Sequence, residues 1–393
     1  MLDASDSPLS RLQHHAEVRG SEVALLEQQG ASWLSLTWSE LHRRVLDGAA
    51  GMMQSGVGVG QVVVILVPAG VRLVELELAT RAAGAVPLML PEGLEPRKVG
   101  TLLAGMDVRL VVADRQQRLA QLRHVRLAEA ELFECDDESW GRLRAFGAQH
   151  RTRTPGLVAR AEASRAPALT RTVLALPRDK NDPWLFWPDA TGTTGELVAD
   201  DVVLVVGAPS DRFTTVVRDA HQRAGCTLAW VEAPERLGAG LQHVRPTHVL
   251  LDQACARVLD DVLVNACLDD LPWHAAPQDV LDAASAVAAG ARVGSKGRRL
   301  AAELTRLAPW WGDRMRVLVV DGRVGRTVTG LAAGLGFEVG RMSHVPASRL
   351  DLAVRRPPAR PQPAPRSVAQ PQPDPADSLP RRARSGLDAA FSL

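Results

Sequence analysis

Residues 184–195 read Trp184-Leu185-Phe186-Trp187-Pro188-Asp189-Ala190-Thr191-Gly192-Thr193-Thr194-Gly195, an apolar run that passes into a loop of small residues. The apolar run predicts a short buried strand, and the residues after it predict a tight loop. Small residues let successive backbone N–H groups converge on an anion, and threonine hydroxyls add further donors. The candidate phosphate-binding residues are therefore Thr191, Gly192, Thr193, Thr194 and Gly195.

The residues after this loop are unfavourable for an anion. Residues 196–201 contain no lysine or arginine, but they contain the acids Glu196, Asp200 and Asp201. A carboxylate about 7 Å from a phosphate opposes binding by about 2 kcal/mol at an effective dielectric constant of roughly 20, before screening. Two interpretations stay open: a nucleotide site built from backbone and hydroxyl donors, or a turn that joins two strands and binds nothing.

The loop resembles the S-G-T-T-G-x-P-K-G phosphate loop of the adenylate-forming enzymes, a family that includes acyl-CoA synthetases, luciferases and peptide-synthetase adenylation domains. Thr191 stands at the serine position, the next four residues match, and Val198 stands at the lysine position. Three more segments resemble the family in order and spacing: Thr37-Trp38-Ser39-Glu40-Leu41, Val63–Pro68 and Arg81–Leu88. The resemblance covers roughly residues 20–345 and depends on motif order, since each motif is weak alone.

The resemblance implies a domain that binds ATP or AMP together with an acyl ligand, but this sequence departs from the pattern twice more. Where the family has an aromatic residue against adenine and a glutamate for magnesium, this chain has Arg341-Met342-Ser343-His344-Val345-Pro346. We expect no counterpart of the family's ribose-binding aspartate, hinge and lysine-bearing C-terminal domain. We therefore assign no catalytic residue and no metal ligand, and ATP or AMP is the candidate cofactor.

Apolar periodicity predicts an α/β fold of alternating strands and helices. We expect a hairpin over residues 23–36, then a helix that starts near Ser39 and ends at Gly56. A second helix is expected to stop at Gly84. Further strands are expected at 61–67, 110–113, 202–206, 227–231, 248–251 and 317–320. Such alternation predicts parallel pairing, here in two stacked parallel-sheet α/β subdomains.

Composition shifts divide the chain into four expected segments. Residues 1–150 form an N-terminal α/β subdomain, and residues 151–182, rich in Arg, Ala, Pro and Thr, form a connector. Residues 183–345 form a second α/β subdomain that includes the phosphate loop, and residues 346–393 form a proline-rich tether.

The tether is the second candidate site. Nine prolines lie between Pro357 and Pro380 inclusive, so we expect an extended, disordered segment that ends in a short apolar motif. Such a segment can project the motif into the groove of a partner protein, and a basic cluster beside it would steer an acidic partner. An unstructured end without a partner is the alternative. The candidate docking residues are Arg381, Arg382, Arg384, Leu387, Phe391 and Leu393.

Charge and cysteine content exclude several classes of partner. The chain has 46 basic and 45 acidic residues, so its net charge of +1 gives no bulk attraction to nucleic acid or anionic membranes. Four cysteines lie far apart without a C-x-x-C motif, which favours free thiols in a reducing compartment. We find no signal peptide and no apolar run of membrane-spanning length, and so expect a cytoplasmic protein. His14 and His15 are expected to be solvated.

These observations favour a degenerate, non-catalytic relative of the adenylate-forming ligases that acts as a binding or scaffolding protein. Two alternatives stay open. One is an acyl-CoA synthetase-like ligase that adenylates a carboxylic acid with ATP, with its C-terminal domain supplied by another chain. The other is a protein that holds AMP or an acyl ligand without turning it over.

Overall fold

The computed structural model describes residues 7–90, 106–116, 130–164, 173–175, 185–187, 197–207, 211–231, 233–259, 314–321 and 337–341, with isolated positions between these stretches. Two compact units divide the chain. The first contains the residues up to Asp201 together with Ser210–Trp230, and the second contains Val202–Pro209 together with Val231–Ser343. This division differs from the boundary expected at residue 183, and the four-segment scheme stays a prediction.

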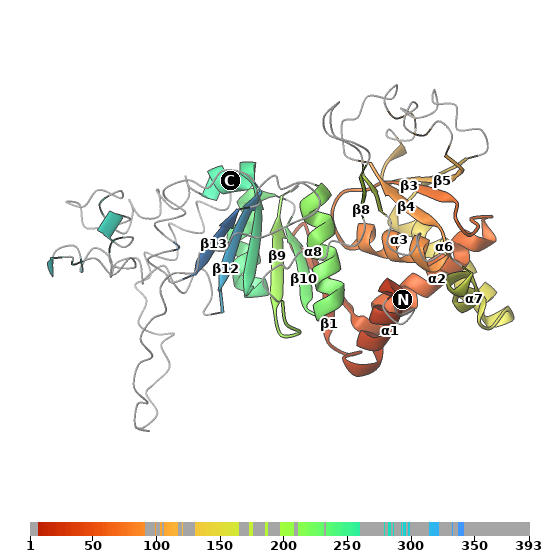
Figure 1. The fold of residues 1–393 in the computed structure, drawn as a ribbon, viewed down its shortest axis with the longest axis horizontal. Helices are drawn as coiled ribbons and strands as arrows, with labels where there is room; N and C mark the ends of the chain where they lie inside the picture. The colour runs from red at the N-terminus through yellow and green to blue at the C-terminus, as the bar shows by residue number, and fades with distance from the viewer. Residues whose placement is uncertain are drawn as a thin grey trace. The chain divides into compact units, whose positions relative to one another are not determined.

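Strands and helices alternate as the periodicity predicts (Figure 1). The helices are α1 (Pro8–Val18), α2 (Trp38–Gln54), α3 (Val71–Ala82), α6 (Asp137–Arg153), α7 (Leu157–Ala163), α8 (Asp211–Ala224), the short 3-10 turn η2 (Pro234–Arg236) and α9 (Leu237–Val244). The strands are β1 (Val23–Gln29), β2 (Ser32–Thr37), β3 (Val62–Leu66), β4 (Val86–Met89), β5 (Val108–Ala113), β6 (Glu131–Glu134), β7 (Val173–Ala175), β8 (Leu185–Trp187), β9 (Val202–Val206), β10 (Thr227–Val231), β11 (His248–Asp252), β12 (Val317–Asp321) and β13 (Glu338–Arg341). Because α7 and β7 lie within residues 151–182, the expected connector contains regular structure.

A six-stranded sheet forms the centre of the first unit, in the order β6-β5-β3-β4-β7-β8. Its strand pairs are parallel except β7–β8, which is antiparallel. Side chains alternate between the two faces, so Val62 and Val64 share one apolar cluster with Leu88 and Val111. Helices α2, α3 and α6 pack together, with α3 against β3 and β4 (Figure 1).

Local capping explains where α2 begins and ends. The Thr37 hydroxyl accepts the Glu40 N–H at 3.2 Å, and the Glu40 carboxylate accepts the Thr37 N–H at 2.9 Å. This reciprocal capping box makes Thr37 the N-cap, two residues before Ser39, near which the helix start was predicted. The predicted end is confirmed, since Gly56 follows the last turn with φ of +87°.

A seven-stranded sheet has the order β13-β12-β11-β9-β10-β1-β2. The predicted hairpin β1–β2 is confirmed as its antiparallel edge, and β1 pairs in parallel with β10, with Leu25 opposite Leu228. In the second unit, β9, β11, β12 and β13 pair in parallel. The described structure therefore confirms the α/β class with largely parallel sheets.

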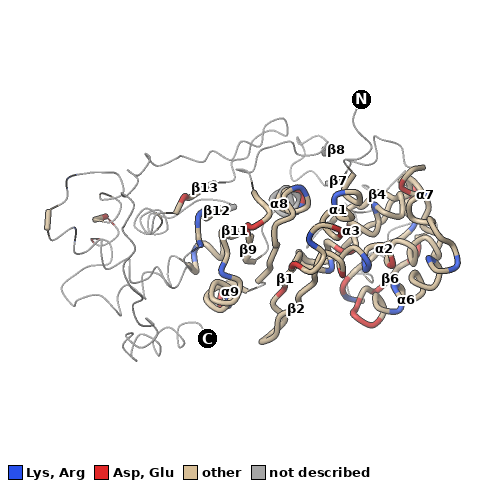
Figure 2. The backbone as a smooth tube through the Cα atoms, turned by 90° about the horizontal axis from the view of Figure 1, so that it is seen from below, with Lys and Arg blue, Asp and Glu red and all other residues tan. Residues whose placement is uncertain are grey.

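Charges of both signs are interspersed along α1, α2, α3 and α6 rather than separated into patches (Figure 2). Within the described residues, no helix has both the length and the apolar character needed to cross a bilayer.

Candidate functional site

The candidate phosphate loop is bracketed by described backbone on both sides. Thr191, Gly192, Thr193, Thr194 and Gly195 themselves lie outside the described residues. Before the loop, the predicted strand is confirmed as β8, which pairs antiparallel with β7. After the loop the described chain resumes at Leu197.

Val198 and Asp201 form a small hydrogen-bonded turn where the chain leaves the loop. The Val198 N–H donates to the Asp201 carboxylate at 2.9 Å, and the Asp201 N–H donates back to the Val198 carbonyl at 2.9 Å. The Asp201 side chain is 1% exposed, whereas Val198 is 50% exposed. The Asp201 carbonyl also accepts the N–H of Thr227 at the start of β10, 3.0 Å away. Asp201 therefore anchors the residues after the loop to the sheet. The exposed Val198 stands where the phosphate loop of the adenylate-forming enzymes has its lysine.

Arg19 connects the same exit to α1 and α8. Its guanidinium lies 3.5 Å from the Asp200 carboxylate, donates to the Gly225 carbonyl at 3.0 Å and donates to Glu22 at 2.9 Å. The hydrogen bond to Glu22 raises the pKa of Arg19. Asp200 and Asp201, which the sequence shows only as negative charges after the loop, thus both have structural partners.

In the second unit, residues pack closely at the carboxyl ends of the parallel strands. This is the edge of a parallel sheet at which α/β proteins bind ligands. Gly207, which follows β9, has φ of +79°. A Cβ at Gly207 would lie 2.5 Å from the Asp252 carboxylate and 2.5 Å from the Cys255 sulfur. Asp252, at the end of β11, accepts the Cys255 N–H at 2.6 Å and is the register partner of Asp321 at the end of β12.

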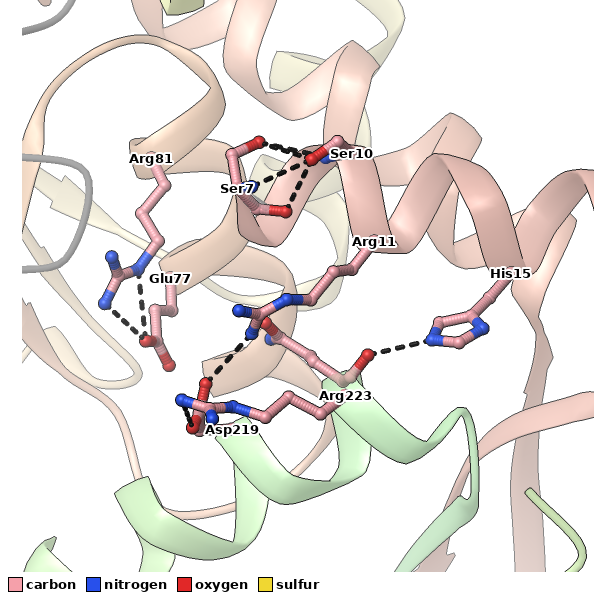
Figure 3. Close-up of polar contacts among 9 residues, drawn as sticks. Ser7, Ser10, Arg11, His15, Glu77, Arg81, Asp219 and Arg223 are labelled. Atoms are coloured by element: carbon pink, nitrogen blue, oxygen red, sulfur yellow. Dashed lines mark hydrogen bonds and ion pairs between the residues drawn. The ribbon is translucent and has the colours of Figure 1, made fainter. Parts of the chain in front are cut away.

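A buried ionic cluster fixes α8 against α3 in the first unit. The Glu77 carboxylate accepts from Arg218 of α8 at 2.8 Å and from Arg81 one turn along α3 at 3.2 Å. Burial raises the pKa of Glu77, but the two guanidinium groups outweigh it and hold that pKa below its ordinary value. Arg218 also reaches the Met89 sulfur at 3.1 Å. Figure 3 shows Glu77 and Arg81 side by side on α3.

The described cysteines do not supply a nucleophile. Cys135, Cys226 and Cys255 are buried free thiols; Cys267 lies outside the described residues. Burial raises the pKa of Cys135 and of Cys226 to about 12 and raises the pKa of Cys255 as well. Thiols of this kind stay protonated at neutral pH and react slowly. In the described part of the chain, no group of three or more His, Cys, Asp or Glu residues could hold a metal ion.

None of the candidate phosphate-binding or docking residues predicted from the sequence lies in the described part of the chain. The docking residues Arg381, Arg382, Arg384, Leu387, Phe391 and Leu393 lie outside the described residues, as do residues 342–346. Sequence reasoning missed Arg19, Glu77 and Arg218, because a charged residue on a helix gives no local sign that a distant carboxylate or carbonyl buries it. The i, i+4 spacing of Glu77 and Arg81 on α3 was the one available signal, and it indicates only that pair.

The N-terminal part of the chain is similar to known proteins. Residues 12–183 match the family described as AMP-binding enzyme. Acetyl-coenzyme A synthetase of Thiobacillus denitrificans is 28% identical over 153 residues, which is 35% of this chain and 23% of that protein. The matched stretch is thus less than a quarter of that relative's length.

Solved structures share the fold at lower sequence identity. The adenylation domain of a carboxylate reductase from Mycobacterium chelonae is 12% identical, with a TM-score of 0.63 over 87% of this chain and 59% of that one. The N-terminal subdomain of Klebsiella oxytoca NpsA, in complex with 3-hydroxybenzoyl-AMSN, is 13% identical, with a TM-score of 0.53 over 85% of this chain and 71% of that one. The described chain therefore has the fold of the large part of adenylation domains.

Proposed function

Because residues 12–183 match the family described as AMP-binding enzyme, we propose that the chain is a non-catalytic, cytosolic relative of that family that acts as a binding or scaffolding protein. The exposed Val198 carries this proposal. Val198 stands where the phosphate loop of the adenylate-forming enzymes has its lysine. Adenylation develops negative charge on phosphate oxygens, and a fixed cation must stabilise that charge. The nearby Arg19 is engaged with Glu22, Asp200 and the Gly225 carbonyl, which supports a structural role for that cation.

Ligand binding without turnover fits the same site. Backbone N–H groups and threonine hydroxyls of residues 191–195 can hold a phosphate without a lysine, though more weakly. The solved NpsA N-terminal subdomain holds 3-hydroxybenzoyl-AMSN, so a relative of comparable extent binds such a ligand. We therefore propose ATP, AMP or an acyl ligand as occupants of this chain, with Thr191, Gly192, Thr193, Thr194 and Gly195 as the contacts.

Isothermal titration calorimetry tests the binding half of the proposal. We expect AMP and ATP to bind the purified full chain, and Thr193→Ala to weaken that binding. Thr37→Ser is the control for general effects of a threonine substitution. It keeps the hydroxyl that caps α2, and position 37 is far from the loop in the sequence. If neither nucleotide gives binding heat, with or without magnesium, the proposed nucleotide binding is contradicted.

Partner capture tests the scaffolding half. We propose that the basic cluster at Arg381–Arg384 and the apolar residues Leu387, Phe391 and Leu393 dock into a partner protein. Deletion of residues 381–393 should abolish every specific partner recovered with the full chain. If the deletion variant recovers the same partners as the full chain, the proposed docking role is contradicted.

The alternative is an acyl-CoA synthetase-like ligase whose C-terminal domain acts in trans. The match to acetyl-coenzyme A synthetase favours it, because that relative's name states such an activity. In such a reaction the carboxylate attacks the α-phosphate of ATP and pyrophosphate leaves. Exchange of labelled pyrophosphate into ATP, with a panel of carboxylic acids and lost in Gly192→Asp, would favour the ligase over the binding protein.

A further inference from the structure

Trp38, at the start of α2, lies between two histidine rings in the first unit. The His221 ring of α8 stacks on the indole with ring centres 4.9 Å apart and planes 15° from parallel. The His15 ring of α1 lies 4.7 Å from the same indole at 46°. Trp38, His221 and His15 are 1%, 0% and 8% exposed, so the expectation that His15 is solvated is wrong. Three helices thus meet through one buried aromatic cluster.

Hydrogen bonds assign the tautomer of each ring. His221 Nδ1 lies 2.6 Å from the Cys226 carbonyl oxygen, and a carbonyl can only accept, so Nδ1 carries the proton. By the same reasoning His15 Nε2 donates to the Gln222 carbonyl at 2.8 Å, the bond drawn in Figure 3. The opposite nitrogen of His221, Nε2, is buried without a hydrogen-bond partner in the described structure. A second proton on His221 would therefore have no acceptor.

The surrounding charges also oppose a second proton. Arg11 and His14 on α1, and Arg19 directly after it, lie near His15, and His15 itself faces His221. The carboxylate on the facing helix, Asp219, lies 3.3 Å from Arg11 and 2.8 Å from Arg223. Figure 3 shows Asp219 between these two guanidinium groups and away from the His15 ring.

We propose that the Trp38–His15–His221 cluster is an acid-sensitive latch that holds α1 on α8 and α2 only while both imidazoles are neutral. Protonation of either ring places a cation in a buried site without a counter-charge, so α1 separates from α8. The close approach of Gly225 supports a rigid fit, because a Cβ there would lie 2.7 Å from the His15 ring. The latch is independent of the nucleotide and docking roles proposed above.

The direction and size of the effect follow from linkage. Burial lowers the pKa of His221 from 6.5 to about 3, and burial also lowers the pKa of His15. The latched state therefore binds fewer protons than the open state, is favoured above pH 6.5, and loses that advantage as the pH falls from 6.5 towards 3. For His221 alone, the opening constant rises about 30-fold between pH ~7.5 and pH ~5, which is about 2 kcal/mol.

Hydrogen–deuterium exchange of the full chain tests the latch. Peptides covering α1 (Pro8–Val18) should lose protection at pH ~5 relative to pH ~7.5, by about 30-fold after correction for the intrinsic exchange rate. Peptides covering α6 (Asp137–Arg153) should keep their protection. Equal loss in α1 and α6 would indicate general acid unfolding and would overturn the proposal, as would an α1 whose protection does not change.

Two variants separate titration from packing. Asparagine can replace Nδ1–H of His221, and glutamine can replace Nε2–H of His15, so His221→Asn and His15→Gln keep each donor without an ionisable ring. His221→Asn should remove most of the pH response of α1, and His15→Gln should reduce it. The matched control His14→Gln, on the same helix, removes one neighbouring charge but neither latch ring, so it should change the response less than either latch variant. A full response in both latch variants would overturn the proposal.

A measurement on the unaltered chain remains decisive if a variant fails to fold. Nuclear magnetic resonance of isotope-labelled histidine should show one imidazole, assigned to His221, that stays neutral at pH ~5 for as long as α1 is closed. Protonation of that imidazole near pH ~6.5 without any opening of α1 would contradict the latch.

Discussion

Replacement of Glu77 by glutamine should strongly destabilise the first unit. The Glu77 carboxylate is buried and contacts Arg218 at 2.8 Å and Arg81 at 3.2 Å. Glu77→Gln keeps the shape of the side chain but removes the negative charge between two buried guanidinium groups. Removing one partner of a buried ion pair costs about 3–5 kcal/mol, because the remaining charge has lost its compensation. We expect a loss within that range, since the carboxylate accepts from both guanidinium groups.

Urea denaturation followed by circular dichroism measures this loss. With a slope of about 2 kcal/mol per molar urea, a loss of about 4 kcal/mol moves the midpoint down by about 2 M. The matched control is Glu138→Gln on α6, which removes an exposed carboxylate 3.7 Å from Arg142. Exposed pairs contribute about 0–1 kcal/mol, so the control should stay near the wild type. Equal midpoints for Glu77→Gln and Glu138→Gln would refute the reasoning.

Two further substitutions test local geometry. Gly225→Ala should destabilise the chain by about 1–3 kcal/mol more than Gly30→Ala, as measured by thermal unfolding. Both glycines have positive φ. A Cβ at Gly225 would meet the His15 ring, whereas nothing lies within 4 Å of a Cβ at Gly30. Equal losses would show that the close approach to His15 carries no cost. Thr37→Ala should cost about 1 kcal/mol by removing the hydroxyl that caps α2, and Thr37→Ser should restore it. A Thr37→Ser variant as unstable as Thr37→Ala would argue against the capping box.

Local patterns predicted the elements that depend on nearby residues. The hairpin, α2, β3 and α3 follow from periodicity, and Gly56 and Gly84 end their helices with positive φ as expected. The pairing of β1 with β10 was missed, because register between strands about 200 residues apart leaves no local mark.

The burial of polar side chains was the second feature that the sequence did not predict. His15 lies on a polar segment and gives no sequence sign that a carbonyl of Gln222 will accept its proton. Arg218 likewise belongs to a charged helix, and only the folded chain brings it to Glu77. The phosphate-loop residues Thr191–Gly195 lie outside the described structure, so their role stays a prediction from their chemistry and from the resemblance.

The most direct test of the account is mass-spectrometric detection of acyl-AMP made by the purified full chain with ATP, magnesium and a panel of carboxylic acids. With a valine at position 198, we predict no acyl-AMP above the level of a protein-free control. Acyl-AMP that forms with the unaltered chain and disappears in Gly192→Asp would contradict the proposed loss of catalysis.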